Sequence, residues 1–190
     1  YISGKNAETK EESVMLVMFY YSFFKQSPGK EGFSSIEEGL NRVLEDQAIR
    51  DEVLSIFQYN YENIEFMEIE NRLDFICPLT VHSRYSTAQI LAAFEYYNAE
   101  KSPAFREGVK YFKDKHIDIF FITLNKSEKE FSPSTLYEDY AINERLFHWQ
   151  TQSTVAESSS TARRYISHKK HGHKIALFVR EYKKEHGYTS

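Results

Sequence analysis

Several residue types and signals that would define a class of protein are scarce in this chain of 190 residues. It has one cysteine, Cys77, so no disulfide can form within the chain and a cysteine-based zinc site is disfavoured. The low counts of 7 Gly and 4 Pro exclude collagen, low-complexity repeats and long flexible linkers. No apolar run approaches the roughly 18 residues of a membrane span, and no signal peptide is visible. Because the chain does not begin with Met, we expect a cytoplasmic piece of a longer polypeptide.

Hydrophobic residues make up 41% of the chain and aromatic residues 16%, which is enough to build a core. The net charge of -4 is unevenly distributed. Residues 1–95 hold eight Lys and Arg against sixteen Asp and Glu, whereas residues 96–190 hold sixteen against twelve. The most basic stretch, 163–184, contains a single acidic residue, Glu181. This asymmetry favours contact of the second half with a polyanion, and the alternative is a solvated basic face.

Helical patterns dominate the first half. Residues 11–26 are apolar all round, which predicts a buried helix. A capping pattern at Ser35 precedes a second helix, and a third covers residues 50–59 with Val53, Leu54 and Phe57 inward.

In the second half, Ser86 caps a short helix, and a serine-rich turn at 158–161 caps another over about 162–169. Strands are predicted at 117–124, 145–150 and 174–182. The chain is therefore expected to be α+β, with an acidic helical bundle over residues 1–75 and a β-rich domain over 76–190.

Enzyme motifs are incomplete. The chain has no phosphate-binding loop and no nucleophile elbow. A phospholipase-D-type pattern begins at His168 and Lys170 but fails where Ile175 replaces the required Asp. We therefore expect no catalytic residue, no metal and no cofactor in this chain, and read the histidines of the basic turn, including His173, as surface or phosphate contacts. The alternative is a metal-dependent nuclease that uses Glu181 and Lys183 with Asp118 or Asp139.

An aromatic-polar segment over 137–152 has the composition of a base-binding surface, because aromatic planes stack on bases and carboxylates accept from cytosine amines. Strand alternation puts Phe147 and Trp149 on one face and His148 and Gln150 on the other. We expect the aromatic pair to face a base, together with Tyr140, and Asp139 to accept from the base. The alternative places Trp149 in the core. The predicted phosphate-binding residues are Arg84, Arg163, Arg164, Lys169, Lys170 and Lys174.

Several ordered blocks carry a family resemblance: 78–86 (PLTVHSRYS) leading to 90–94 (ILAAF), 120–126 (FFITLNK) then 130–133 (EFSP), 137–142 (YEDYAI) then 146–150 (LFHWQ), and finally 164–166 (RYI) and 177–181 (LFVRE). Together they resemble the C-terminal domain-of-unknown-function module of large bacterial polypeptides that also carry a phospholipase-D-like nuclease and a superfamily II helicase. Some of these polypeptides are SauUSI-like type IV restriction enzymes, which cut DNA containing modified cytosine. The resemblance covers about residues 76–188.

The resemblance implies that this chain recognises DNA, whereas the parts that cut it and use ATP and magnesium lie elsewhere on the polypeptide. Its implied partners are double-stranded DNA with modified cytosine and the helicase and nuclease domains of the same polypeptide, in a bacterial host-defence system. By analogy we expect a PUA-like or SRA-like curved sheet that holds a flipped base, truncated at its C-terminus. A cytosine methyl group would add about 1 kcal/mol of apolar contact. The alternative is a docking module between helicase and nuclease that does not bind DNA.

Overall fold

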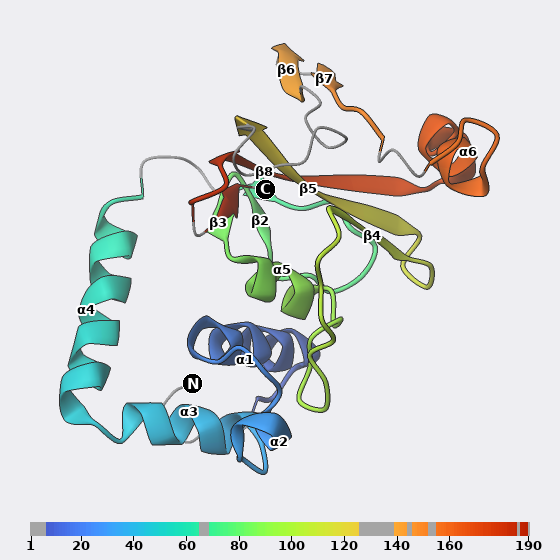
Figure 1. Cartoon of the computed structure of the whole chain (residues 1–190). Coiled ribbons are helices and arrows are strands. Elements are labelled where there is room, and N and C mark those ends of the chain that lie inside the picture. Colours follow the sequence, from blue (N-terminus) through green and yellow to red (C-terminus); the bar gives the residue numbers. More distant parts are fainter. Residues whose placement is uncertain are drawn as a thin grey trace. The chain divides into compact units, whose positions relative to one another are not determined.

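A computed structural model describes residues 7–64, 69–125, 139–143, 146–151, 155–185 and 187–189. The chain divides into two compact units, which we call unit 1 (residues 1–105) and unit 2 (residues 106–190). The change from helical to strand patterns predicts a boundary at residue 75, and the two compact units divide after Phe105. Figure 1 shows their helices and strands.

Unit 1 is mostly helical, and its helices begin where short polar side chains cap them. α1 spans Lys10–Phe23 and starts with a capping box in which Thr9 and Glu12 bind each other's backbone N–H groups. α5 spans Thr87–Ala93 and starts with the equivalent box of Ser86 and Gln89, which confirms the predicted cap. The other helices are α2 (Pro28–Glu31), α3 (Ile36–Leu44) and α4 (Gln47–Glu62).

The core of unit 1 forms where α1 packs against α3 and α5. Tyr20 of α1 is fully buried, as are Ile90, Leu91 and Phe94 on and just after α5. A Cβ atom on Gly39 of α3 would lie 2.6 Å from Cε2 of Tyr20, so this close approach requires glycine.

Tyr20 provides a testable feature of this core. Among the described residues, its hydroxyl is the buried side-chain polar atom without a hydrogen-bond partner. Burial, followed by the negative charge of Glu31, raises the pKa of Tyr20 from 10.0 to about 12. The unfolded chain therefore releases this proton first, so stability is fully present below pH 10 and falls as the pH rises towards 12.

Tyr20→Phe is expected to stabilise the protein by about 1 kcal/mol at neutral pH, because it removes an unsatisfied hydroxyl. It should also reduce the loss of stability between pH 10 and 12. Urea unfolding followed by far-UV circular dichroism at pH 7 and pH 11 measures both effects. Tyr59→Phe is the matched control, since Tyr59 is 67% exposed. A Tyr20→Phe variant less stable than the wild type at pH 7 would contradict this account.

Three two-residue strands complete unit 1. β1 (Ile69–Glu70) pairs antiparallel with β2 (Thr80–Val81), and β3 spans Arg84–Tyr85. Between β1 and β2, the side-chain amide of Asn71 donates to the carbonyl oxygens of Cys77 and Leu79. This amide fixes the shape of the loop that leads to β2.

Two expectations about burial in unit 1 are wrong. α4 contains no buried residue, and the predicted inward side chains Leu54 and Phe57 are 53% and 45% exposed. α1 is not buried all round, because Met15 is also 53% exposed. A sequence pattern shows which residues share a helix face, but it does not show whether another element covers that face.

Unit 2 is built on a mixed sheet. Its central strand β5 (Ile117–Asn125) pairs antiparallel with β4 (Val109–Phe112) and parallel with β8 (Lys174–Tyr182), and β9 (Tyr188–Thr189) runs antiparallel to β8. A parallel pair needs a crossover connection, and α6 (Ser160–Ile166) lies on it, followed by the 3-10 turn η2 (Lys169–His171). A separate hairpin pairs β6 (Tyr140–Asn143) with β7 (Leu146–His148).

A helical region followed by a mixed sheet confirms the predicted α+β class. The strand predicted at 174–182 matches β8, and the strand predicted at 117–124 matches β5 apart from one added residue. The third predicted strand is shorter than expected, because β7 ends at His148.

Candidate functional site

Unit 2 contains a fully buried carboxylate, Asp118, which is paired with the guanidinium of Arg164. Asp118 of β5 accepts two hydrogen bonds from Arg164 of α6, at 2.7 Å from Nε to Oδ2 and 3.1 Å from Nη2 to Oδ1. Nε2 of His173 lies 2.8 Å from the same Oδ2. A buried charge requires partners of this kind. This cluster of Asp118, Arg164 and His173, which we call the node, therefore fixes α6 and the start of β8 against β5.

Strand pairing, together with the local structure of α6 and η2, brings the three side chains together. β4, β5 and β8 are adjacent strands, and the register pairs Asp118 with Tyr111 on one side and Ile175 on the other. Ser159 caps the N-terminus of α6, because its side chain accepts from the N–H of Ala162, and the helix presents Arg164 about one turn later. Gly172 has a φ of 63°, a conformation that favours glycine, and turns the chain from η2 into His173.

Arg164 also lies over aromatic rings. Its guanidinium carbon is 3.8 Å from the ring centroid of Tyr111 and 5.4 Å from that of Tyr165. The hydrogen bonds that Arg164 donates to Asp118 raise the pKa of Arg164 against the opposing effect of desolvation, and burial raises the pKa of Tyr165. The guanidinium therefore stays charged, and Tyr165 stays neutral at physiological pH.

An aromatic cluster adjoins this node on the same face of β5. The ring of Trp149 stacks on Phe120 with centroids 4.2 Å apart, and Tyr165 meets both rings edge-on. Phe120 is buried, whereas Trp149 is half-buried. Trp149 therefore packs against two rings with part of its surface open to solvent.

Asp139 positions the segment that carries Trp149. Its side chain is 5% exposed, and its Oδ1 accepts from the backbone N–H of Gln150 at 3.1 Å. This bond ties the start of β6 to the residue after Trp149. A base would have to share Asp139 with that backbone group.

The predicted base-binding aromatics do not all gather on one face. The β6–β7 register pairs Tyr140 with His148, and their rings stack 4.8 Å apart. Phe147 pairs with Ala141 on the other face of the hairpin. The hairpin thus separates Tyr140 from Phe147, and Tyr137 and Gln152 lie outside the described residues.

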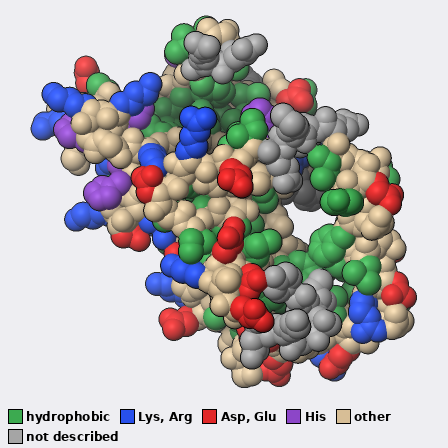
Figure 2. Space-filling model, turned by 180° about the vertical axis from the view of Figure 1, so that it is seen from behind, with side chains coloured by type: hydrophobic (Ala, Val, Ile, Leu, Met, Phe, Trp, Pro, Cys, Tyr) green, Lys and Arg blue, Asp and Glu red, His purple; other side chains and the backbone are tan. Residues whose placement is uncertain are grey.

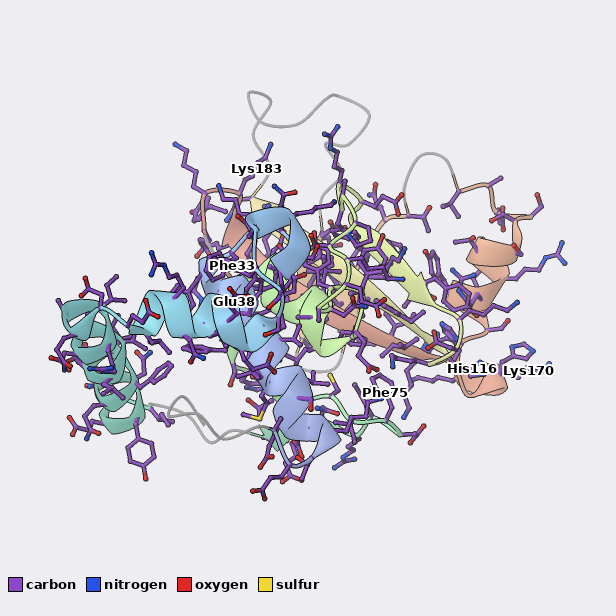
Figure 3. All side chains as sticks on the ribbon, turned by 90° about the horizontal axis from the view of Figure 1, so that it is seen from below. Phe33, Glu38, Phe75, His116, Lys170 and Lys183 are labelled. Atoms are coloured by element: carbon purple, nitrogen blue, oxygen red, sulfur yellow. The ribbon has the colours of Figure 1, made fainter. Side chains whose placement is uncertain are left out.

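Five of the six predicted phosphate-binding residues fall into two groups. Arg163, Lys169 and Lys170 are exposed on α6 and η2, and Lys174 opens β8 directly after them. Lys170 and the turn at His116 are labelled near each other in Figure 3, and Figure 2 shows Lys, Arg and His side chains gathered at the α6 end of unit 2. Arg84 is exposed on β3 of unit 1.

Two basic-segment residues have roles that sequence reasoning missed. The surface assignment of His173 is wrong, because His173 is 7% exposed and bonded to Asp118. Arg164, predicted to bind phosphate, directs Nε and Nη2 to Asp118 instead of to solvent. An Asp at the second position of a mostly apolar strand, Asp118 in β5, was the one sequence signal for this node.

Candidate catalytic groups are dispersed in the described part of the chain. No group of three or more His, Cys, Asp or Glu side chains there could hold a metal ion. Glu181 lies near the end of β8, with Oε1 3.5 Å from the amide of Asn125, whereas Asp118 is bonded to Arg164 and His173. In the same described part, no helix has the length and hydrophobicity to cross a membrane.

A family model described as a domain of unknown function (DUF3427) matches residues 79–189. This match covers more than half of the chain, and the chain belongs to that family. The resemblance to a domain-of-unknown-function module is therefore confirmed, although the family's description carries no activity. No curated protein and no solved structure matches the chain.

Proposed function

We propose that this chain is the DNA-recognition module of a modification-dependent restriction helicase–nuclease, and that unit 2 binds DNA and reads modified cytosine. The observation that carries the proposal is the continuity of two surfaces. Tyr165 of α6 packs against the half-buried Trp149, and α6 and η2 also present exposed Arg163, Lys169 and Lys170. Aromatic rings that stack on bases beside cations that bind phosphates are the pairing that nucleic-acid recognition uses.

We assign a role to each part of the site. Trp149 is the stacking surface, and Arg163, Lys169, Lys170 and Lys174 bind the DNA backbone. Arg164 is a positioning residue, because its bonds to Asp118 hold α6 in place. The type IV restriction system, the modified base and the flipping of that base rest on the sequence resemblance, to which the aromatic surface adds support.

The proposal assigns recognition and no bond cleavage to this chain. Asp118, the buried acid nearest to a metal role in sequence reasoning, is already bonded to a guanidinium and an imidazole. ATP and magnesium would then serve other domains of the parent polypeptide.

Reversing two exposed cations tests the DNA surface. Lys169→Glu with Lys170→Glu should weaken binding to methylated and unmethylated duplexes alike. It should also reduce the slope of log K against log salt by about two units, because each lost phosphate contact contributes about 0.9. Fluorescence anisotropy of labelled duplexes over a salt series measures both quantities.

Lys25→Glu with Lys30→Glu changes the net charge equally on unit 1 and serves as the control. An unchanged affinity and slope in the Lys169/Lys170 variant would contradict DNA binding through α6 and η2. Magnesium-dependent cleavage of the duplex that disappears in Glu181→Gln would replace the proposal with the nuclease alternative.

A further inference from the structure

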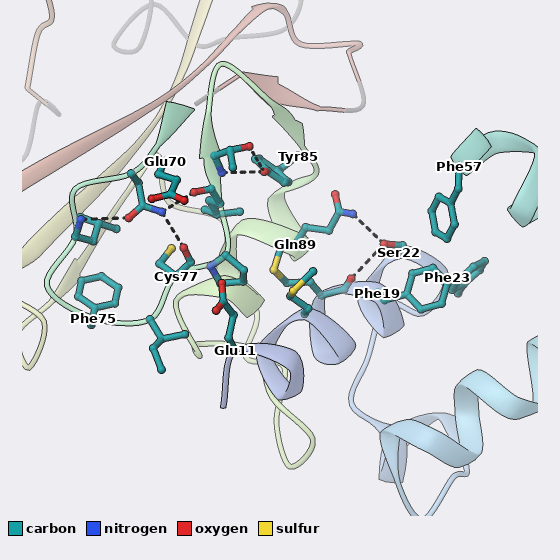
Figure 4. A pocket seen from close by; sticks show the side chains of 18 of the residues that line it. Glu11, Phe19, Ser22, Phe23, Phe57, Glu70, Phe75, Cys77, Tyr85 and Gln89 are labelled. Carbon is teal, nitrogen blue, oxygen red and sulfur yellow. Dashed lines mark hydrogen bonds between the residues drawn. The ribbon is translucent and has the colours of Figure 1, made fainter. Parts of the chain in front are cut away.

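Unit 1 contains a cavity of about 950 Å³ between α1, α4 and the loop that joins β1 to β2 (Figure 4). One wall is formed by Met15, Phe19 and Phe23 of α1. Ile56 and Phe57 of α4 form part of another. The two helices come together at Phe19 and Phe57, whose ring centroids are 5.8 Å apart.

The cavity is open to solvent along apolar side chains. Met15, Ile56 and Phe57 are 53%, 48% and 45% exposed, although all three line it. In Figure 2, hydrophobic side chains border the gap beside α4. Apolar surface left exposed and contiguous in this way marks an interaction site.

Charge at this groove has one sign. Among the described residues that line it, the charged ones are Glu11 on α1 and Glu70 on β1. Both are set beside the apolar walls, and Figure 4 labels them on the elements that border the cavity. A ligand that buries apolar groups here would therefore meet carboxylates at the edges.

We propose that this groove binds an amphipathic α-helix of another polypeptide, which has apolar residues along one face and Lys or Arg beside them. Such helices insert side chains at i, i+3, i+4 and i+7 into apolar grooves. Flexible methionines adapt to such partners, and Met15 and Met18 both line this groove. The basic flanks pair with Glu11 and Glu70.

A helix fits these observations better than a small molecule does. Small-molecule sites bury most of the ligand in about 300–1,000 Å³, and this cavity lies at the top of that range with half-exposed walls. The inference concerns unit 1 alone and does not depend on DNA binding by unit 2.

A pair of synthetic peptides tests the proposal on the full chain. One is a helix of about five turns with Leu at i, i+3, i+4 and i+7 and Lys elsewhere, and the other replaces Lys with Glu. Anisotropy of the labelled peptides should show the Lys peptide binding about tenfold more tightly at low salt. Glu11→Gln with Glu70→Gln should remove most of that preference.

Substitutions on α4 locate the binding face. Phe57→Glu should weaken binding of the Lys peptide about tenfold or more, because it places a charge in the apolar wall. Leu54→Glu is the matched control, since Leu54 is on the same helix, is 53% exposed and does not line the cavity. Methylated DNA should bind Phe57→Glu as it binds the wild type, which separates this test from that of the proposed function.

Three results would overturn the proposal. In the first, neither peptide binds, or both bind equally at low salt. In the second, Leu54→Glu weakens the Lys peptide as much as Phe57→Glu does. In the third, sedimentation shows a dimer that Phe57→Glu dissociates, which would assign the groove to a second copy of the chain.

Discussion

Asp118→Asn is expected to cost about 3–5 kcal/mol of stability in unit 2, because it leaves the partly buried Arg164 without its counter-charge. Asparagine keeps the shape of the side chain, so the loss reports charge and not a cavity. His173 loses the carboxylate oxygen 2.8 Å from its Nε2 as well. Both partners come from other elements, so α6 and the start of β8 should loosen together.

Urea unfolding followed by tryptophan fluorescence measures this effect, because Trp149 is the chain's one tryptophan and lies in unit 2. Asp114→Asn is the matched control, since Asp114 is an exposed carboxylate in the turn between β4 and β5. It should change stability by less than about 0.5 kcal/mol. Equal midpoints for Asp118→Asn and Asp114→Asn would show that the buried node does not stabilise unit 2.

A double substitution tests whether Asp118 and Arg164 stabilise unit 2 as a pair. Asp118→Leu with Arg164→Met removes both charges and should recover much of the loss seen in either single variant, because no unpaired charge then remains. If the losses of the two single variants simply add, the two residues act independently.

Elements with a strong local signal were predictable from sequence. β5 is a run of β-branched and aromatic residues, and β8 contains the continuous apolar run 175–179. The starts of α3 and α5 were predictable because Ser35 and Ser86 cap residues three positions ahead. In each of these cases the information lies within a few residues of the element.

Partners distant in sequence were not predictable. Arg164 is 46 residues from Asp118, and His173 is 55 residues from it. Viewed along the chain, both residues belong to a basic run, and only the β5–β8 pairing and α6 bring them to a carboxylate. The exposure of Phe57 was missed for the converse reason, since an apolar stripe does not show how much of its surface other elements cover.

The same contrast between local signals and distant partners applies to the site residues. Alternation correctly separates His148 from Phe147, but the face that Tyr140 shares depends on the hairpin register. That register, with Asn143 opposite Leu146, places Tyr140 on His148. Trp149 lies just beyond β7, and its neighbours Phe120 and Tyr165 come from other elements.

Trp149→Ala is expected to weaken binding of methylated duplex DNA by about 1–3 kcal/mol, the usual cost of removing an aromatic ring that stacks on a base. Unit 2 should still unfold cooperatively, because Trp149 is half-buried and Phe120 beneath it remains in the sheet. The stability lost should be smaller than the cost of replacing a fully buried aromatic residue by alanine, which is about 3–5 kcal/mol. Far-UV circular dichroism measures unfolding in this variant, and anisotropy measures affinity for methylated and unmethylated duplexes.

Trp149→Phe is the control, since it retains a ring and should retain most of the binding. A Trp149→Ala variant that binds methylated DNA normally, or one whose unit 2 no longer folds, would place the base-binding surface elsewhere.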